Sequence, residues 1–240
     1  SCAPNAVLFT GGDNDTFPLW YVQEVEGFRR DVRVCNLSLL GTEWYIQQMK
    51  RKTYESDALP ISLEFDNFNK GKNDIVPFYE MAGVKNGIDL KQYISLIKTN
   101  NPAIQVPLTS GDMTSILPSS VLFLPIDKAA VDQANFVPAN LRPLMKDTLQ
   151  WTIGKKDLYK PDLIMLDMIA TNNWKRPIYF SSTLASDNYL SLKNYMQLEG
   201  YAYRLMPVAI PGATDGYVNS DIMYNNMLKK TFWRDFDNPN

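Results

Sequence analysis

Short apolar runs, each followed by a polar turn, recur along the chain. The first spans 6–10 and ends in Gly11-Gly12, and similar runs lie at 31–37, 121–126 and 177–181. Continuous apolar runs of this length are typical of strands buried on both faces of a parallel sheet. Segments with helical spacing of apolar residues separate them. The pattern therefore predicts an α/β fold with an open, mostly parallel, Rossmann-like sheet and helices on both faces.

The expected helices follow from apolar spacing and from residues that start or stop a helix. Pro18 is expected in a first turn, where its missing N–H costs nothing, and Thr42 is expected to cap the next helix. The predicted helices span 17–26, 43–50, 89–99, 141–151, 161–172, 190–198 and 221–230, and further short strands are expected at 59–63 and 201–208.

The segment about 64–118 is rich in Gly and Asn and lacks a sustained period, which predicts a loop-rich insertion. We expect an α/β domain over 1–210 that contains this insertion. The C-terminal extension, 211–240, is expected to lead into a downstream region that is missing here, so the chain is expected to be one piece of a larger protein.

Composition excludes several classes of function. The 240 residues are 45% hydrophobic and 21% charged, which is ordinary for a folded protein. A net charge of −2 gives no basic field, so nucleic acid is not an expected partner. The absence of His removes serine–histidine catalysis and the commonest zinc sites from this chain. No apolar stretch reaches the roughly 18 residues of a membrane span, so no direct membrane insertion is expected.

Polar residues follow four of the predicted strands, and ligands bind beyond the carboxyl ends of the strands in open parallel sheets. If the sheet is parallel throughout, these residues meet at one rim. The candidate ligand-binding residues are Asp13, Asn14, Asp15, Asn36, Ser38, Asp127, Ser181 and Ser182.

The turn that begins at Gly11-Gly12 has three interpretations. It could cradle a phosphate at a helix N-terminus, although it lacks the usual glycine spacing and carries two carboxylates. Asp13 and Asp15 could instead bind a divalent cation or a sugar, because carboxylate oxygens suit hard cations. The third interpretation is structural, with one Asp capping the helix and Asn14 in a left-handed turn. No organic cofactor is expected, and the divalent cation stays open.

Two further features have mainly structural explanations. Cys35 lies in an apolar run, which favours a buried thiol, and its spacing from Cys2 does not indicate a disulfide framework. The pairs Trp20-Tyr21 and Trp44-Tyr45 are expected to pack on the sheet, with a carbohydrate platform as the alternative.

Two blocks of sequence resemble a known family. The first block is made of 5–10, 12–21, 23–27, 31–34, 36–40 and Glu43-Trp44-Tyr45, and the second spans 170–180. Together they are similar to a bacterial family of large membrane proteins, labelled as a domain of unknown function, that resembles protein O-mannosyltransferases. A vertebrate transmembrane O-mannosyltransferase shares its general plan.

The resemblance implies a membrane glycosyltransferase of the GT-C type with many spans, followed by a soluble extracytoplasmic region to which this chain corresponds. The catalytic carboxylate of such enzymes lies between membrane spans, so no catalytic residue carries over to this chain. We expect an accessory domain on the periplasmic side that binds an acceptor protein or glycan, or braces the membrane part, with its own transmembrane part as a partner. An independent cation-dependent enzyme using Asp13 and Asp15, and a pure scaffold, are the alternatives.

Overall fold

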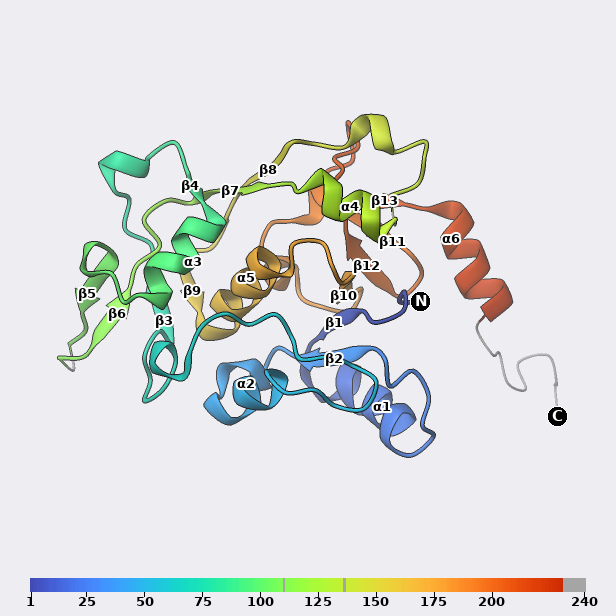
Figure 1. The fold of residues 1–240 in the computed structure, drawn as a ribbon, viewed down its shortest axis with the longest axis horizontal. Coiled ribbons are helices and arrows are strands. Elements are labelled where there is room, and N and C mark those ends of the chain that lie inside the picture. The colour runs from blue at the N-terminus through green and yellow to red at the C-terminus, as the bar shows by residue number, and fades with distance from the viewer. Residues whose placement is uncertain (110, 136, 231–240) are drawn as a thin grey trace.

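The main sheet of the protein has six strands. The computed structural model describes residues 1–109, 111–135 and 137–230 (Figure 1). The strand order is β13-β11-β12-β10-β1-β2, and β1 pairs in parallel with both β10 and β2. The strands are β1 (Val7–Thr10), β2 (Arg33–Asn36), β10 (Ile178–Ser181), β11 (Met196–Leu198), β12 (Ala202–Leu205) and β13 (Tyr217–Val218). Three of the five pairings are parallel, because β12 runs antiparallel to β10 and β11.

Helices cover both faces of this sheet. On one face, α1 (Gly12–Glu24) places Leu19 against a small cluster around Leu8 and Val32. On the other face, α2 (Glu43–Met49) and α5 (Lys160–Asn172) pack on the large core. Every residue of β1, β2 and β10 is buried, as the continuous apolar runs predict. The expected α/β class with a mostly parallel sheet is confirmed.

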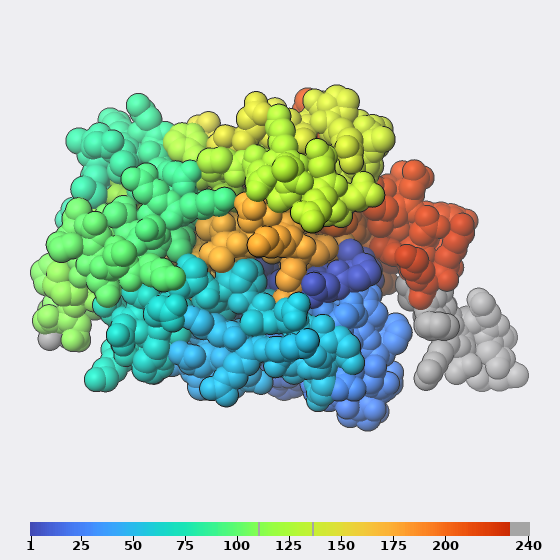
Figure 2. Space-filling view, in the orientation of Figure 1, coloured from blue at the N-terminus to red at the C-terminus, as the bar shows by residue number. Residues whose placement is uncertain are grey.

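The segment between α2 and α5 forms smaller sheets. One contains β4 (Ile88–Asp89), β7 (Val121–Pro125) and β8 (Thr148–Thr152); the others pair β3 (Ile75–Pro77) with β9 (Asp157–Tyr159) and β5 (Gln105–Pro107) with β6 (Met113–Ser115). The helices α3 (Leu90–Lys98) and α4 (Lys128–Ala134) belong to this segment, whereas α6 (Ser220–Tyr224) and the π-helix Asn225–Lys230 follow the main sheet. Figure 2 shows the teal and green atoms of the segment at one end of the molecule, while its yellow-green atoms, with α4, extend toward the red C-terminal helix.

The expectation that the strand at 121–126 joins the main sheet is wrong. This strand, β7, pairs with β4 and β8 in a separate sheet. Its burial alternates, with Leu122 and Leu124 buried and their neighbours more exposed, whereas β1 is buried along its whole length. An apolar run does not reveal whether one or both faces of the strand are buried. The sequence pattern therefore could not distinguish a strand of the main sheet from a strand of a smaller, half-exposed sheet.

Two expected helices are also wrong. Residues 148–152 form β8, because Leu149 and Trp151 alternate with exposed polar residues in a two-residue period. The segment 190–198 begins with Leu190 and Ser191 in the left-handed region, at φ 51° and 60°, so no helix continues through it. It contains a short 3-10 turn and β11 instead.

The ends of other elements differ from expectation. Helix α1 starts at Gly12, so Pro18 lies inside it and not in its first turn. The segment 59–63 forms no strand, and the backbone N–H groups of Ser62 and Leu63 donate to the buried Asp167 carboxylate. Helices α3 and α5 lie within a residue or two of their expected ranges. Residues 231–240 of the expected C-terminal extension lie outside the described residues.

Candidate functional site

The carboxyl ends of β1, β2 and β10 meet at one rim of the main sheet. These ends are adjacent because β1 pairs in register with both neighbours. Helix α1 begins directly after β1, and α5 runs toward the start of β10, so the first turn of each helix lies on this side. The rim brings together Asp15, Asn36 and Ser181 of the predicted candidates. Figure 1 shows the three strands side by side.

The Asp15 carboxylate joins the turn after β1 to the loop after β10. Its Oδ2 accepts the Gly11 N–H at 3.0 Å. Its Oδ1 accepts the Ser181 hydroxyl at 2.9 Å and the Thr183 hydroxyl at 2.7 Å. Both oxygens are therefore engaged within the protein. The half-buried Asp15 does not cap α1, because the N-cap residue is Gly11 and no side chain bonds the first helical N–H groups.

Asn36 holds the end of β2 against α1. Its side-chain amide donates to Gly12 O at 3.1 Å and to the Thr16 hydroxyl at 2.8 Å. Its side-chain carbonyl accepts the Leu39 N–H at 3.1 Å. The side chain is 1% exposed, so these bonds satisfy a buried polar group and leave no free atom for a ligand.

The other rim candidates face solvent. Asp13, Asn14, Ser38 and Ser182 are exposed, and their side chains make no hydrogen bond within the part of the chain that the structure describes. The expected left-handed backbone at Asn14 is wrong, because the positive φ of 64° belongs to Gly12. Among the described residues, no group of three or more His, Cys, Asp or Glu side chains could hold a metal ion.

Asp127 lies away from the rim, which corrects the expectation that it joins this site. It caps α4 by accepting the Ala130 N–H at 3.0 Å, and its other oxygen accepts the Asn173 amide at 2.9 Å. These hydrogen bonds, with the Asn173 bond the largest cause, lower the pKa of Asp127. The residue follows β7, and β7 belongs to the separate sheet.

A cleft of about 460 Å³ opens at the rim, and we call it the rim cleft. Its lining combines strand ends, the first turn of α5 and the loop after β10: Gly11, Gly12, Leu37, Ser38, Lys155, Tyr159, Pro161, Asp162, Met165, Thr183, Leu184, Ala185 and Asn188. Its volume is within the roughly 300–1,000 Å³ of small-molecule sites. A β-carbon at Gly11 would lie 2.8 Å from Leu184 Cδ2, so glycine lets the turn and the loop meet here.

The charges in the rim cleft are paired. Lys155 Nζ lies 2.7 Å from Asp162 Oδ1, and the other oxygen of Asp162 accepts the Tyr159 N–H at 2.9 Å. Both carboxylate oxygens of Asp162 are thus occupied at the start of α5. The groups left for a ligand are backbone N–H groups, hydroxyls and the Asn188 amide. Because carboxylates stand at the start of both helices, the phosphate interpretation of the Gly11-Gly12 turn fits poorly.

Comparison with protein families gives one match. The family model described as TMEM260-associated domain 2 matches residues 1–222. This chain belongs to that family. No curated protein and no solved structure matches the chain.

The match of the TMEM260-associated domain 2 family covers both the main sheet and the insertion. The rim cleft therefore lies wholly inside the matched residues. Within the described residues, no helix of the domain is both long and apolar enough to cross a bilayer.

Sequence reasoning missed the contribution of α5 to the rim cleft. Pro161 and Asp162 did indicate the start of a helix. Its position beside the rim, however, depends on the path that the chain takes between β2 and β10. Lys155 carried no signal of its own, because a single Lys before a helix is usually solvent-exposed.

The cysteines of this domain are free. Cys35 is buried in the main core, and burial raises the pKa of its thiol to about 12. Burial likewise raises the pKa of Cys2 to about 11. A thiol with so high a pKa is a poor nucleophile at neutral pH, so the expected structural role of Cys35 agrees with its surroundings.

Proposed function

We propose that this chain is an extracytoplasmic accessory domain of a membrane-bound glycosyltransferase-like protein, where it binds the acceptor protein or a glycan at the rim cleft. The rim cleft carries the proposal, because it lies where open α/β sheets bind ligands. Its one lining carboxylate, Asp162, is paired with Lys155, and Asp15 beside the cleft holds the loop after β10. Such a site suits binding better than proton transfer.

Family membership and the sequence resemblance support the wider setting. The TMEM260-associated domain 2 match agrees with a resemblance to large membrane proteins similar to protein O-mannosyltransferases. In that setting the catalytic carboxylate and the lipid-linked sugar belong to the transmembrane part. The transmembrane part is then the partner of this domain, which lies on the periplasmic side.

An independent cation-dependent enzyme has less support. It would need Asp13 and Asp15 to converge on one ion. Asp15 instead accepts three hydrogen bonds, and Asp13 is exposed. A pure scaffold differs from the proposal only in leaving the rim cleft without a ligand.

A pair of matched substitutions in the full-length protein tests the proposal. Ser38→Trp puts an indole into the rim cleft, whereas Ser182→Trp puts one on the exposed loop after β10, outside that lining. We expect Ser38→Trp to reduce sugar transfer to the acceptor and Ser182→Trp to leave it unchanged. Both variants should express and melt as the wild type does.

Two results would contradict the proposal. Turnover of a nucleotide sugar or a polyprenyl-phosphate sugar by the purified domain would favour the independent enzyme. Full transfer activity after Ser38→Trp, and also after removal of this domain, would leave no accessory role at the rim cleft.

A further inference from the structure

A second concave surface lies along the free edge of β2, between α1 and α2. β2 is the last strand of the main sheet, and the two helices pack against different hydrophobic clusters on its two faces. Figure 1 shows both helices next to β2. A groove of about 340 Å³ follows this edge, and we call it the β2-edge groove. Trp20 of α1, Trp44 of α2 and Tyr54 from the turn after α2 contribute aromatic side chains to its lining. It shares no lining residue with the rim cleft.

The aromatic side chains of the β2-edge groove are exposed to an unusual degree. Trp44 is 60% exposed and Tyr54 is 46% exposed. Trp20 is partly buried and stacks on Phe17, with ring centroids 5.7 Å apart. Isolated exposed apolar residues are normal on protein surfaces, but several aromatic residues around one concavity mark a binding surface.

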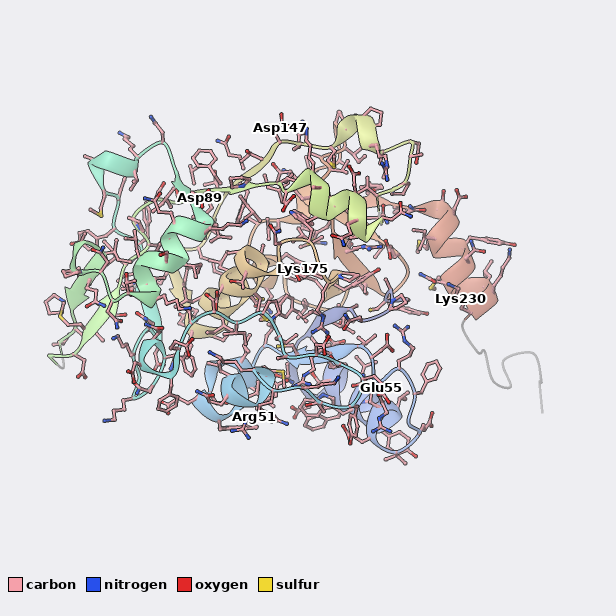
Figure 3. The ribbon with its side chains drawn as sticks, in the orientation of Figure 1. Arg51, Glu55, Asp89, Asp147, Lys175 and Lys230 are labelled. Carbon is pink, nitrogen blue, oxygen red and sulfur yellow. The ribbon has the colours of Figure 1, made fainter. Side chains whose placement is uncertain are left out.

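Tyr54 is held in place by its surroundings. Its backbone is left-handed, at φ 55°, which is uncommon for a residue with a bulky side chain. Its hydroxyl donates to Glu24 Oε2 at 2.5 Å, and the Arg30 guanidinium lies 3.5 Å from the ring centroid. Figure 3 shows the neighbouring Glu55 and Arg51 in this α1–α2 layer. The Tyr54 ring therefore keeps a fixed orientation at the groove.

A buried arginine in the groove lining has an unused donor. Arg33 is 6% exposed, and its Nη2 donates to Gln48 O at 3.0 Å and to Arg51 O at 3.1 Å. Its Nη1 has no hydrogen-bond partner, and within 1–109, 111–135 and 137–230 the guanidinium makes no ion pair. Burial lowers the pKa of Arg33, because no carboxylate compensates the loss of water. A buried donor without a partner is costly, so a small shift of the Arg33 side chain that brings Nη1 to an acceptor on a ligand would be stabilising.

An added peptide strand does not suit this edge. The Gln23 side-chain amide donates to Val32 O at 2.7 Å, and the Tyr45 hydroxyl accepts the Asn36 N–H at 2.9 Å. Val34, which lies between them, is 4% exposed. Side chains of the domain thus occupy or cover the outward backbone groups that strand addition needs.

We propose that the β2-edge groove is a carbohydrate site, in which a hexose ring lies against Trp44 and Tyr54 and a shift of the Arg33 side chain lets an oxygen of the sugar accept its Nη1–H. Aromatic side chains offer an apolar face together with polar edges, which matches a sugar ring with its C–H face and peripheral hydroxyls. Glu24 and Gln48 add an acceptor and an amide to the lining. The site deepens the proposed function and rests on its expectation that the domain binds glycan, but at a place distinct from the rim cleft.

NMR titration of the purified domain tests the proposal with three probes: mannotriose, maltotriose and digalacturonate, each at millimolar concentration. We expect at least one of them to shift the indole N–H signals of Trp20 and Trp44. The signals of Trp151 and Trp174 should stay in place, because these side chains are 5% and 7% exposed and lie outside the groove. A stronger response to digalacturonate than to the neutral sugars would identify a carboxylate as the acceptor for Arg33.

Substitutions separate the groove from general effects on the fold. Trp44→Ala removes an exposed ring and should weaken binding by about tenfold or more. Tyr79→Ala is the matched control, because Tyr79 is 66% exposed and lies outside the groove, and it should leave binding unchanged. Arg33→Lys keeps the charge but loses the planar fork, and should weaken binding even in preparations that melt as the wild type does.

Absence of any shift at Trp20 and Trp44 with all three sugars would overturn the proposal. So would shifts there with an extended acceptor peptide but with no sugar. The accessory role at the rim cleft would survive either result, because its test uses Ser38→Trp and sugar transfer by the full-length protein. Conversely, unchanged sugar transfer by the Ser38→Trp variant, together with sugar-dependent shifts at Trp20 and Trp44, would reject only the proposed role of the rim cleft.

Discussion

The rim of the main sheet and the β2-edge groove both include part of β2, but they differ in whether their buried polar side chains have hydrogen-bond partners. At the rim, Asn36 and Asp15 direct every side-chain oxygen or amide toward another part of the protein. In the groove, Arg33 leaves a buried N–H without a partner. Two of the rim residues predicted as ligands, Asp15 and Asn36, are structural, whereas an arginine inside an apolar run carries the stronger sign of a ligand.

The contrast teaches that residue type alone is a weak guide to a site. A carboxylate that follows a strand has a structural role when it accepts hydrogen bonds from hydroxyl and N–H groups of two loops and so holds them together, as Asp15 does. Unused hydrogen-bonding capacity in a buried position is more informative, because native proteins rarely leave it unsatisfied.

The largest expected effect comes from removing the rim contacts of Asn36. Asn36→Ala should lower the free energy of unfolding by about 2–4 kcal/mol, because it removes three hydrogen bonds and leaves buried groups unpaired. Urea unfolding would measure the change, with Ser38→Ala as a control on an exposed residue of the same segment. A loss no greater than that of the control would show that Asn36 is not part of the rim framework.

Asp15 should have a smaller effect, since it is only half-buried. Asp15→Ala should cost about 1–2 kcal/mol, since three donors lose their acceptor. Asp15→Asn should cost about half as much, because the amide oxygen can still accept the Gly11 N–H and the amide nitrogen can donate to the hydroxyls, while the charged acceptor is lost. Equal stability of Asp15→Asn and the wild type in thermal or urea melts would contradict the observed geometry and restore a simple capping role.

The segment that leads into β2 at its other end supplies a pH test. Asp31 accepts the Arg29 Nε–H at 2.8 Å and the Asn5 N–H at 2.9 Å, and the Arg29 bond lowers the pKa of Asp31 from 3.8. Because the folded-state pKa lies below the unfolded value, this stabilisation is present above about pH 4 and is lost as the pH falls through the folded-state pKa.

Asp31→Asn should therefore lose less stability than the wild type on acidification, by roughly 1 kcal/mol or less, since the Asp31 side chain is 30% exposed and solvent screens the pair. Chemical unfolding at pH 7 and at pH 3 would measure both proteins. Parallel losses in the two proteins would assign the acid sensitivity to other carboxylates.

The smallest expected effect is that of divalent cations. With Asp15 engaged and Asp13 exposed, Ca²⁺, Mg²⁺ and Mn²⁺ should not shift the Tm. A bound cation at 100 times its Kd would instead add about 2.7 kcal/mol of stability. A Tm increase that disappears in both Asp13→Asn and Asp15→Asn would revive the cation site.

The parts of the fold that the sequence predicted are those whose burial is uniform. The strands β1, β2 and β10 are buried throughout, so their apolar runs identified them and placed Asn36 and Ser181 at a common rim. The strand β7 has a similar composition, yet its pairing with β8 depends on how a distant loop folds back.

The sites were less predictable than the fold for the same reason. Asp15 and Ser181 are 166 positions apart in sequence, and only the β1–β10 pairing makes them partners. The aromatic residues of the groove were visible in the sequence, and a carbohydrate platform was one interpretation of them. The unpaired N–H of Arg33 was not, because it depends on which carbonyl groups of α2 reach its guanidinium.

The pairing of β1 with β10 also constrains how the domain folds during synthesis. Val7 cannot meet Ile178 until the chain between them has left the ribosome. At about 5–20 residues per second, those intervening residues take roughly 10–30 s to be made. For that time β1 and β2 can pair only with each other, and the edge of β1 that later holds β10 stays open. Holdase chaperones that bind extended apolar segments should therefore contact residues 1–40 longer than the later parts of this domain.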